Sequence, residues 1–179
     1  RMVVNNSAQA EFYHDEVQPI IEQRCVVCHG CYDAPCQLKL SSPQGIDRGA
    51  NKELVYDGTR LLAATPQRLF VDNDSTQAWR NNGFYGVLNE RQQSPALNQQ
   101  ASVMSRLLSL KQQHPLPAGK ILPKQFNFSL DREQQCPTDV EIENYVQNYP
   151  DWGMPFGLPA LSKPEDKILQ DWLRNGAKM

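Results

Sequence analysis

The sequence predicts a mainly α-helical domain in which the helices are separated by long loops. Two observations support this prediction. Apolar residues recur at helical spacing in several segments, and most of these segments begin at a recognisable N-cap. Glycines and prolines punctuate the stretches between them, as is typical of turns and loops. At 179 residues the chain is long enough for one domain with its own core, so residues 1–179 are predicted to form a single unit.

The first predicted helix leads directly into a pair of cysteines. Five of its residues recur at helical spacing, and the last of them is next to Cys25: Tyr13, Val17, Ile20, Ile21 and Arg24. Pro19 is predicted to lie in the first turn of this helix, where its missing N–H group is tolerated. His14 is predicted to face solvent.

The middle of the chain is predicted to be rich in loops. Residues 37–40 form a short extended piece, and residues 43–93 are irregular with one or two short helices. Ser94 is a predicted N-cap, and with proline in the first helical position it opens a helix that runs to about Lys111. A loop is predicted from 114 to 130.

Two capped helices are predicted near the C-terminus. Thr138 and Glu141 cap a short helix that carries Ile142, Tyr145 and Val146. Ser162 and Glu165 form a capping box for the last helix, which ends at Gly176. The apolar stripe of this last helix consists of Ile168, Leu169, Trp172 and Leu173.

The cysteine pair and the histidine that follows it form the run Cys25-Val26-Val27-Cys28-His29. This is C-x-x-C-H, the pattern through which a c-type haem is attached. Two thiols three positions apart lie on one face of a helical turn, where they can add to the two vinyl groups on one edge of a porphyrin. His29 can turn one imidazole nitrogen under the iron, and its second nitrogen needs a partner that fixes the tautomer. Cys25 and Cys28 are therefore predicted to be the thioether anchors, and His29 the proximal axial ligand.

Three other interpretations of this cysteine-rich stretch compete with haem attachment. A C-x-x-C-H run can arise by chance, and the thiols and imidazole between Cys25 and Cys36 could bind zinc. Cys25, Cys28 and Cys31 also form C-x2-C-x2-C, which is how a bacterial ferredoxin motif begins. Here, however, the fourth cysteine comes after four residues instead of three, Pro35 precedes it, and no second paired cluster follows. A helix that leads into the motif is typical of the start of a cytochrome c domain.

A cytochrome needs a second axial ligand or a vacancy, and Met154 is the predicted ligand. Of the four methionines, Met2 and Met179 are terminal. Met104 shares a helical face with Leu97, Ala101 and Leu108, which predicts core packing. Met154 lies among turn residues at 152–157, before the last helix, where an extended loop can present a thioether. His114, in a proline-containing loop, could approach the haem edge or a propionate, but a histidine in such a loop is more often solvated.

The predicted architecture is therefore a mainly α, cytochrome c-like haem domain. Long loop and helical insertions separate its two axial ligands, His29 and Met154, which would also be the catalytic residues if the haem carries out a reaction. On these residues alone, an electron-transfer cytochrome c module fits equally well. A net charge of −2 and a pI near 5.9 leave no basic surface for nucleic acid, so nucleic acid is not a predicted partner.

The remaining cysteines predict an oxidising compartment outside the cytoplasm. Cys31 and Cys36 are five positions apart and could close a small loop; alternatively, Cys136 bridges to one of them. One of the three thiols stays free in either case. No signal peptide or transmembrane stretch is visible, so the chain is expected to be the mature part of a secreted protein or a fragment of one.

The sequence around the motif closely resembles the bacterial fatty acid cis/trans isomerases. The resemblance begins with the string from Cys25 through Leu40 and covers nearly the whole chain. It continues through the shorter motifs Arg48-Gly49-Ala50-Asn51-Lys52, Ala64-Thr65-Pro66, Leu88-Asn89-Glu90-Arg91, His114-Pro115-Leu116-Pro117 and Trp152-Gly153-Met154-Pro155. Members of the family are several times longer, so the resemblance implies that this chain corresponds to their N-terminal haem domain, with weak activity or none on its own.

The resemblance also implies a reaction. The family's enzymes are periplasmic haem proteins that convert cis-unsaturated acyl chains of membrane phospholipids into trans ones under solvent or heat stress, without ATP or nicotinamide. It thus implies a covalently attached haem c, phospholipid acyl chains as substrate, and contact with the membrane surface through the rest of the enzyme. Isomerisation requires that the π order of the double bond falls transiently, and an electron-poor iron would draw electron density from the alkene.

Overall fold

The computed structural model describes residues 7–55, 65–117, 119, 121, 122, 126 and 134–179. Within these residues the chain is mainly helical and forms isolated β-bridges but no β-strand, which confirms the predicted helical class. Its likeness to cytochrome c and its organisation as one domain stay predictions. The helical segments are α1 (Ala8–Phe12), η1 (Tyr13–Val17), α2 (Gln18–Arg24), α3 (Val26–His29), η2 (Pro35–Gln37), α4 (Pro43–Arg48), α5 (Thr76–Asn81), α6 (Pro95–Gln100), α7 (Val103–Gln113), α8 (Ile142–Asn148) and α9 (Lys163–Arg174).

The segments α1, η1 and α2 form one helical path that ends at Cys25. Pro19 lies in the first turn of α2, as predicted, while the helical path as a whole begins earlier, at Ala8. A proline inside a helix removes a hydrogen bond to the residue four positions earlier. The path accommodates this through the π-helical turn η1, where the Gln18 N–H bonds to the Tyr13 carbonyl. His14 is exposed, as predicted.

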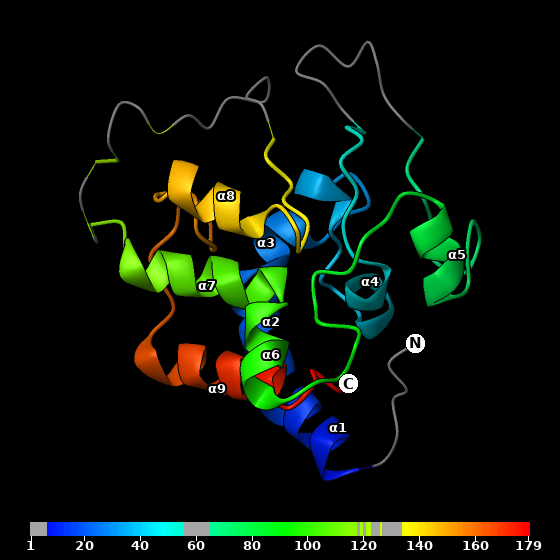
Figure 1. The fold of residues 1–179 in the computed structure, drawn as a ribbon, viewed down its shortest axis with the longest axis horizontal. Helices are drawn as coiled ribbons and strands as arrows, with labels where there is room; N and C mark the ends of the chain where they lie inside the picture. The colour runs from blue at the N-terminus through cyan, green and yellow to red at the C-terminus, as the bar shows by residue number, and fades with distance from the viewer. Residues whose placement is uncertain (1–6, 56–64, 118, 120, 123–125, 127–133) are drawn as a thin grey trace.

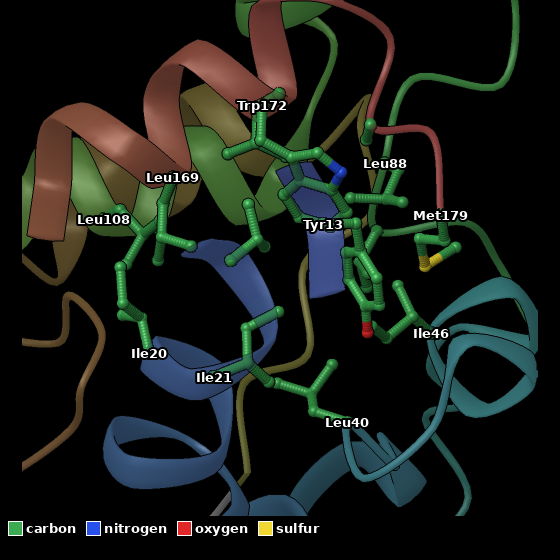
Figure 2. Close-up of a cluster of buried hydrophobic side chains, with 14 of the residues drawn as sticks. Tyr13, Ile20, Ile21, Leu40, Ile46, Leu88, Leu108, Leu169, Trp172 and Met179 are labelled. Carbon is green, nitrogen blue, oxygen red and sulfur yellow. The ribbon is translucent and has the colours of Figure 1, made fainter. Parts of the chain in front are cut away.

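The main core forms where this path meets α9. The predicted capping box and buried apolar stripe of α9 are both present, and the stripe packs against η1 and joins the α2 side chains in one cluster. Figure 2 shows Tyr13, Ile21 and Leu169 in this cluster. Gly176 adopts φ 88°, the left-handed conformation that commonly follows a helix. The chain then turns back, so that the Met179 side chain is buried in the same core.

The helix predicted for 94–111 is two helices. Ser102 ends α6 and caps α7, because its hydroxyl oxygen accepts the Ser105 N–H at 3.1 Å and its O–H donates to the Val87 carbonyl at 3.2 Å. A serine side chain that bonds to the backbone in this way competes with a continuous helix. Leu97 is consequently exposed and not part of the core face that its spacing predicted.

The helices α8, α7 and α9 are stacked in that order on one side of the molecule (Figure 1). A second apolar cluster joins α7 to α8. The predicted cap of α8 is wrong in part, because Glu141 is its N-cap and makes no capping hydrogen bond. The Glu141 carboxylate does accept the Thr138 N–H at 3.0 Å. Most of the predicted loop 114–130 lies outside the described residues. None of the described helices has the length and apolar composition needed to cross a bilayer.

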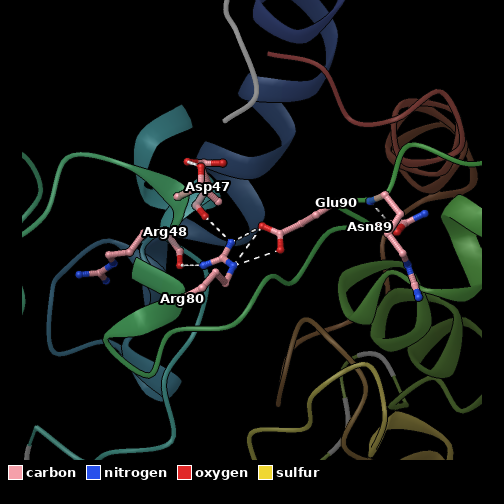
Figure 3. Close-up of polar contacts among 7 residues, drawn as sticks. Asp47, Arg48, Arg80, Asn89 and Glu90 are labelled. Atoms are coloured by element: carbon pink, nitrogen blue, oxygen red, sulfur yellow. Dashed lines mark hydrogen bonds and ion pairs between the residues drawn. The ribbon is translucent and has the colours of Figure 1, made fainter. Parts of the chain in front are cut away.

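The two short helices α4 and α5 are the described helices of the region 43–93, in line with the prediction. Arg80 ties them together, since its guanidinium donates to the Asp47 carbonyl at 2.9 Å and the Arg48 carbonyl at 2.8 Å, and also pairs with Glu90 (Figure 3). Ala64, the first residue of one of the family-like motifs, lies outside the described residues. Gln37 belongs to the short 3-10 segment η2, so the extended piece predicted for 37–40 starts one residue later.

Lys111 on α7 is a buried amine. Its side chain is 1% exposed, and its Nζ has no hydrogen-bond partner. Burial lowers the pKa of Lys111 below its ordinary value of 10.5, while nearby Asp151 partly opposes this shift. A buried polar group without a partner costs about 1–3 kcal/mol, so Lys111 is predicted to destabilise the fold.

We expect Lys111→Met to raise the free energy of unfolding by about 1–3 kcal/mol, because methionine fills similar space and needs no partner. In the natural chain the unfolded state binds more protons than the folded state between the lowered pKa and 10.5. Stability should therefore rise with pH across that window, and the variant should lack this rise. Urea unfolding at several pH values measures both effects, with the exposed Lys163→Met as control. A variant less stable than the natural chain at every pH would contradict the prediction.

Candidate functional site

The single helical turn α3 carries the second cysteine and His29. The Cys25 N–H still bonds to the Ile21 carbonyl of α2, and the N–H groups of Cys28 and His29 both bond to the Cys25 carbonyl, at 3.1 and 3.0 Å. Cys25 is half-buried, Cys28 is exposed, and His29 is 9% exposed. The three predicted haem-binding side chains of the motif therefore come from one turn, as their spacing indicated.

The His29 ring is oriented by a backbone carbonyl. Its Nδ1 lies 3.1 Å from the Leu38 carbonyl oxygen, and the Leu40 N–H bonds to the His29 carbonyl at 2.7 Å. Because a carbonyl oxygen can only accept, Nδ1 carries the hydrogen and Nε2 of the neutral ring keeps its lone pair. Burial lowers the pKa of His29, and the Leu38 carbonyl opposes this only in part. The site thus presents a neutral imidazole with a free ligand nitrogen.

One cavity brings the predicted site residues together. Cys25, Cys28, His29 and Met154 all line it, and its volume is about 140 Å³, with one side open to solvent. Cofactor and small-molecule sites are mostly lined by apolar side chains. Most of this lining is apolar. When His29 is neutral, Arg24 is the one residue of the described lining that carries a formal charge.

The cavity lies between the two larger apolar clusters. Met104 packs against the main core, and Met154 packs against the cluster that joins α7 to α8. Both methionines line the cavity, together with Leu107 and Leu108 of α7. The helical spacing of Met104 predicted core packing, which is correct in part, but it gave no sign that this thioether also borders the cavity.

The loop that carries Met154 is fastened to α7 and α8 through its backbone. The Tyr145 hydroxyl donates to the Trp152 carbonyl at 2.9 Å, and the Met154 N–H donates to the Leu107 carbonyl at 3.0 Å. Gly153 lies between Trp152 and Met154 in the sequence. A Cβ atom there would be 2.3 Å from the Lys111 backbone nitrogen, so only glycine allows this close approach. The position of Met154 at the cavity is therefore set by main-chain contacts.

A disulfide joins Cys36 to Cys136, and both cysteines line the cavity. This confirms the prediction of one bridge and selects Cys136 as the partner. Cys31 is exposed and not bridged. Because Cys36 is oxidised, it cannot serve as a thiolate ligand, and among the described residues no three His, Cys, Asp or Glu side chains gather in a way that could hold a metal ion. Neither the zinc nor the ferredoxin interpretation of the cysteine run gains support from this arrangement.

The structure also places His114 and Arg24. His114 is exposed at the end of α7 and does not line the cavity, which agrees with the expectation of a solvated loop histidine. Arg24 does line it, and its Nη2 donates to the carbonyls of Pro159 and Ala160, at 3.1 and 3.2 Å. Arg24 therefore connects the end of α2 to the chain that follows the Met154 loop, a role that helical spacing alone did not reveal.

Comparison with known protein families identifies the family of this chain. The model of the family described as fatty acid cis/trans isomerase matches residues 64–179, which is well over half of the chain. The matched part includes α7, Met154 and α9, whereas the motif at 25–29 precedes it. No curated protein and no solved structure matches the chain significantly. The chain belongs to the fatty acid cis/trans isomerase family, and it is accordingly a cis/trans isomerase.

Proposed function

We propose that this isomerase is a periplasmic haem c enzyme that acts on unsaturated acyl chains of membrane phospholipids. Cys25 and Cys28 hold the haem through thioether bonds, and His29 and Met154 are its axial ligands. The observation that carries the proposal is the mainly apolar cavity that these four residues line together. Acyl chains are the substrate class suggested by the family, and an apolar cavity suits them.

Three properties of the residues fit a covalently held haem. The two thiols and the imidazole come from one helical turn and line one cavity. The imidazole is neutral, and its other nitrogen is oriented by a carbonyl, as is usual for histidine ligands. Cys25 also packs against the main core, and this burial raises the pKa of its thiol to about 11.

The chain's own residues have limited parts in the reaction. No carboxylate is among the described residues that line the cavity, so a pair of acid and base groups for protonating the alkene is missing there. A bound haem with a thioether ligand has a raised potential and would supply an electron-poor iron. The protein holds His29 through Leu38 and Met154 through α7, and its apolar walls keep water from the acyl chain.

The lining also bears on the electron-carrier alternative. A carrier would need an exposed haem edge ringed by charge that fits a partner protein. Arg24 is the single formally charged residue in the described lining, and the family match points to isomerisation. An apolar lining suits either protein, so the family match is the observation that favours the isomerase.

The proposal is tested by measuring haem and product together. The protein is expressed from its complete gene in a host that attaches haem c, and is then denatured and examined by mass and by its reduced pyridine haemochrome spectrum. The same preparation is mixed with vesicles of cis-unsaturated phospholipid, and the trans-acyl fraction is followed by gas chromatography. Covalent haem with accumulating trans chains is the expected result, while the 179-residue chain alone should hold haem with weak turnover. Haem that acidified solvent extracts, or bound zinc or iron–sulfur, would overturn the proposal.

We expect Met154→Ala to abolish the sulfur–iron charge-transfer band in the far red and to lower the reduction potential, because a thioether ligand raises it. Met104→Ala is the matched control, since Met104 is the other described methionine that lines the cavity. It should keep the band. Visible spectra and redox titration measure both variants. A band that survives in Met154→Ala but disappears in Met104→Ala would assign the ligand to Met104.

A further inference from the structure

We propose that Arg48 is a positioning residue for His29: its buried guanidinium holds the turn at 36–38 in the shape that aims the Leu38 carbonyl at the imidazole. The inference deepens the proposed function and rests on it, because it concerns the proposed proximal ligand. Arg48 itself does not line the cavity. It acts on the site from α4, through the chain that follows the disulfide cysteine Cys36.

Arg48 is completely buried, yet no carboxylate pairs with it in the described part of the chain. The faces of three aromatic rings surround its guanidinium, with centroids at 5.4 Å for Tyr32, 5.7 Å for Trp79 and 4.8 Å for Phe84. Cation–π contacts of this kind stabilise a desolvated guanidinium. In Figure 3 the Arg48 side chain points away from the Arg80–Glu90 pair, so the two arginines serve different parts of the molecule.

The guanidinium joins two chain segments that are distant in sequence. Its Nη2 donates to the Gln37 carbonyl, and its Nη1 donates to the Gln67 carbonyl at 2.5 Å. The planar guanidinium presents two donors in a fixed fork, which a lysine ammonium cannot reproduce. Arginine is therefore specifically suited to this position, and a lysine would keep the charge but lose the geometry.

The turn that Arg48 holds is unusual in its backbone. Cys36 and Gln37 have φ angles of 55° and 49°, in the left-handed region that residues other than glycine rarely adopt. Two such residues in succession persist only where the surroundings over-determine them. The Asn51 N–H donates to the Cys36 carbonyl at 2.8 Å, and Arg48 donates to the next carbonyl along the chain. Hydrogen bonds to consecutive carbonyls thus fix the turn.

The carbonyl after this turn is the one that orients His29. Leu38 returns to an extended conformation, and its carbonyl accepts the His29 Nδ1–H at 3.1 Å. The direction of that carbonyl follows from the backbone angles of the preceding residues. Without the Arg48 bond at Gln37, the turn is free to relax, and the Leu38 carbonyl moves away from the ring.

Two variants test the proposal, Arg48→Lys and Arg48→Met. The matched control is Arg80→Lys, because Arg80 also binds backbone carbonyls of α4 but lies away from the turn. Nitrogen-15 NMR of the purified protein measures hydrogen exchange at the His29 ring nitrogen, with the exposed His14 and His114 as internal references. We expect Arg48→Lys to accelerate this exchange by about tenfold, as the loss of one hydrogen bond predicts. Arg80→Lys should leave it unchanged.

The reduction potential of the haem-loaded protein is the second readout. Loss of the Nδ1–H bond makes the imidazole a weaker donor to iron, so the potential of Arg48→Lys should rise. An unchanged exchange rate and potential in Arg48→Lys, with only a lower melting temperature, would overturn the proposal, as would an equal effect of Arg80→Lys. If Arg48→Met does not fold, Arg48→Lys decides. A protein isolated without haem would refute the proposed function, while the exchange measurement would still test Arg48.

Discussion

Replacing His29 with alanine should lower the rate of trans-acyl formation by more than about 100-fold. Losing a residue that only supports a metal ligand costs up to about 100-fold, and losing the ligand itself should cost more. The reason is that His29 supplies the neutral imidazole at the cavity, and no other histidine lines it among the described residues. The measurement is the trans-acyl fraction against time in cis-unsaturated vesicles, made with protein expressed from its complete gene.

His14→Ala and His114→Ala are the matched controls for this prediction. Both side chains are exposed and lie outside the cavity lining, so both variants should keep the natural rate. The visible spectrum of His29→Ala must first confirm that the native ligation is lost. If that variant still isomerises acyl chains at the natural rate, the haem is not the catalyst, and the electron-carrier interpretation gains support.

Removing the disulfide with Cys136→Ser should lower the free energy of unfolding by about 2–5 kcal/mol. The bridge spans a sequence separation of 100 residues, and closing a loop of this length in the unfolded chain corresponds to about 4.7 kcal/mol in the chain-entropy treatment. The variant should also loosen the part of the cavity wall that Cys136 forms. Urea unfolding without reductant measures the difference.

Cys31→Ser is the control, because Cys31 is exposed and not bridged. It should change stability by no more than about 0.5 kcal/mol. Thiol counting on the unfolded, unreduced and haem-loaded protein should find Cys31 as its free cysteine. A Cys136→Ser variant as stable as the natural chain, or three reactive thiols among Cys31, Cys36 and Cys136, would contradict the bridge.

The last helix, whose signals are neighbours in sequence, was predicted well. The helix α9 has its predicted capping box, stripe and terminal glycine because each of these depends on residues three or four positions apart. The break between α6 and α7 was missed, because the second partner of Ser102 is the carbonyl of Val87. The spacing of 94–111 contains no information about that contact.

The same distinction applies to the candidate site. The motif at 25–29 and the turn-rich surroundings of Met154 identified four cavity residues from spacing and residue type. The sequence left the partner of the disulfide open, because loop closure permits several pairings and only the fold brings Cys36 next to Cys136. Met104 was assigned to the core alone, since helical spacing cannot distinguish a core contact from a cavity wall.

The sequence by itself determined the helical class, the capped helix α9, the cysteine pair with its histidine, and the resemblance that the family match confirms. These features depend on residue type and short-range spacing, which the sequence displays directly. Only the tertiary structure decided that Cys136 is the partner of Cys36, that the Leu38 carbonyl orients the imidazole, and that Arg48 on α4 bonds to the Gln37 carbonyl. Such contacts join segments far apart in the chain, and their geometry arises only when the packed core holds those segments together.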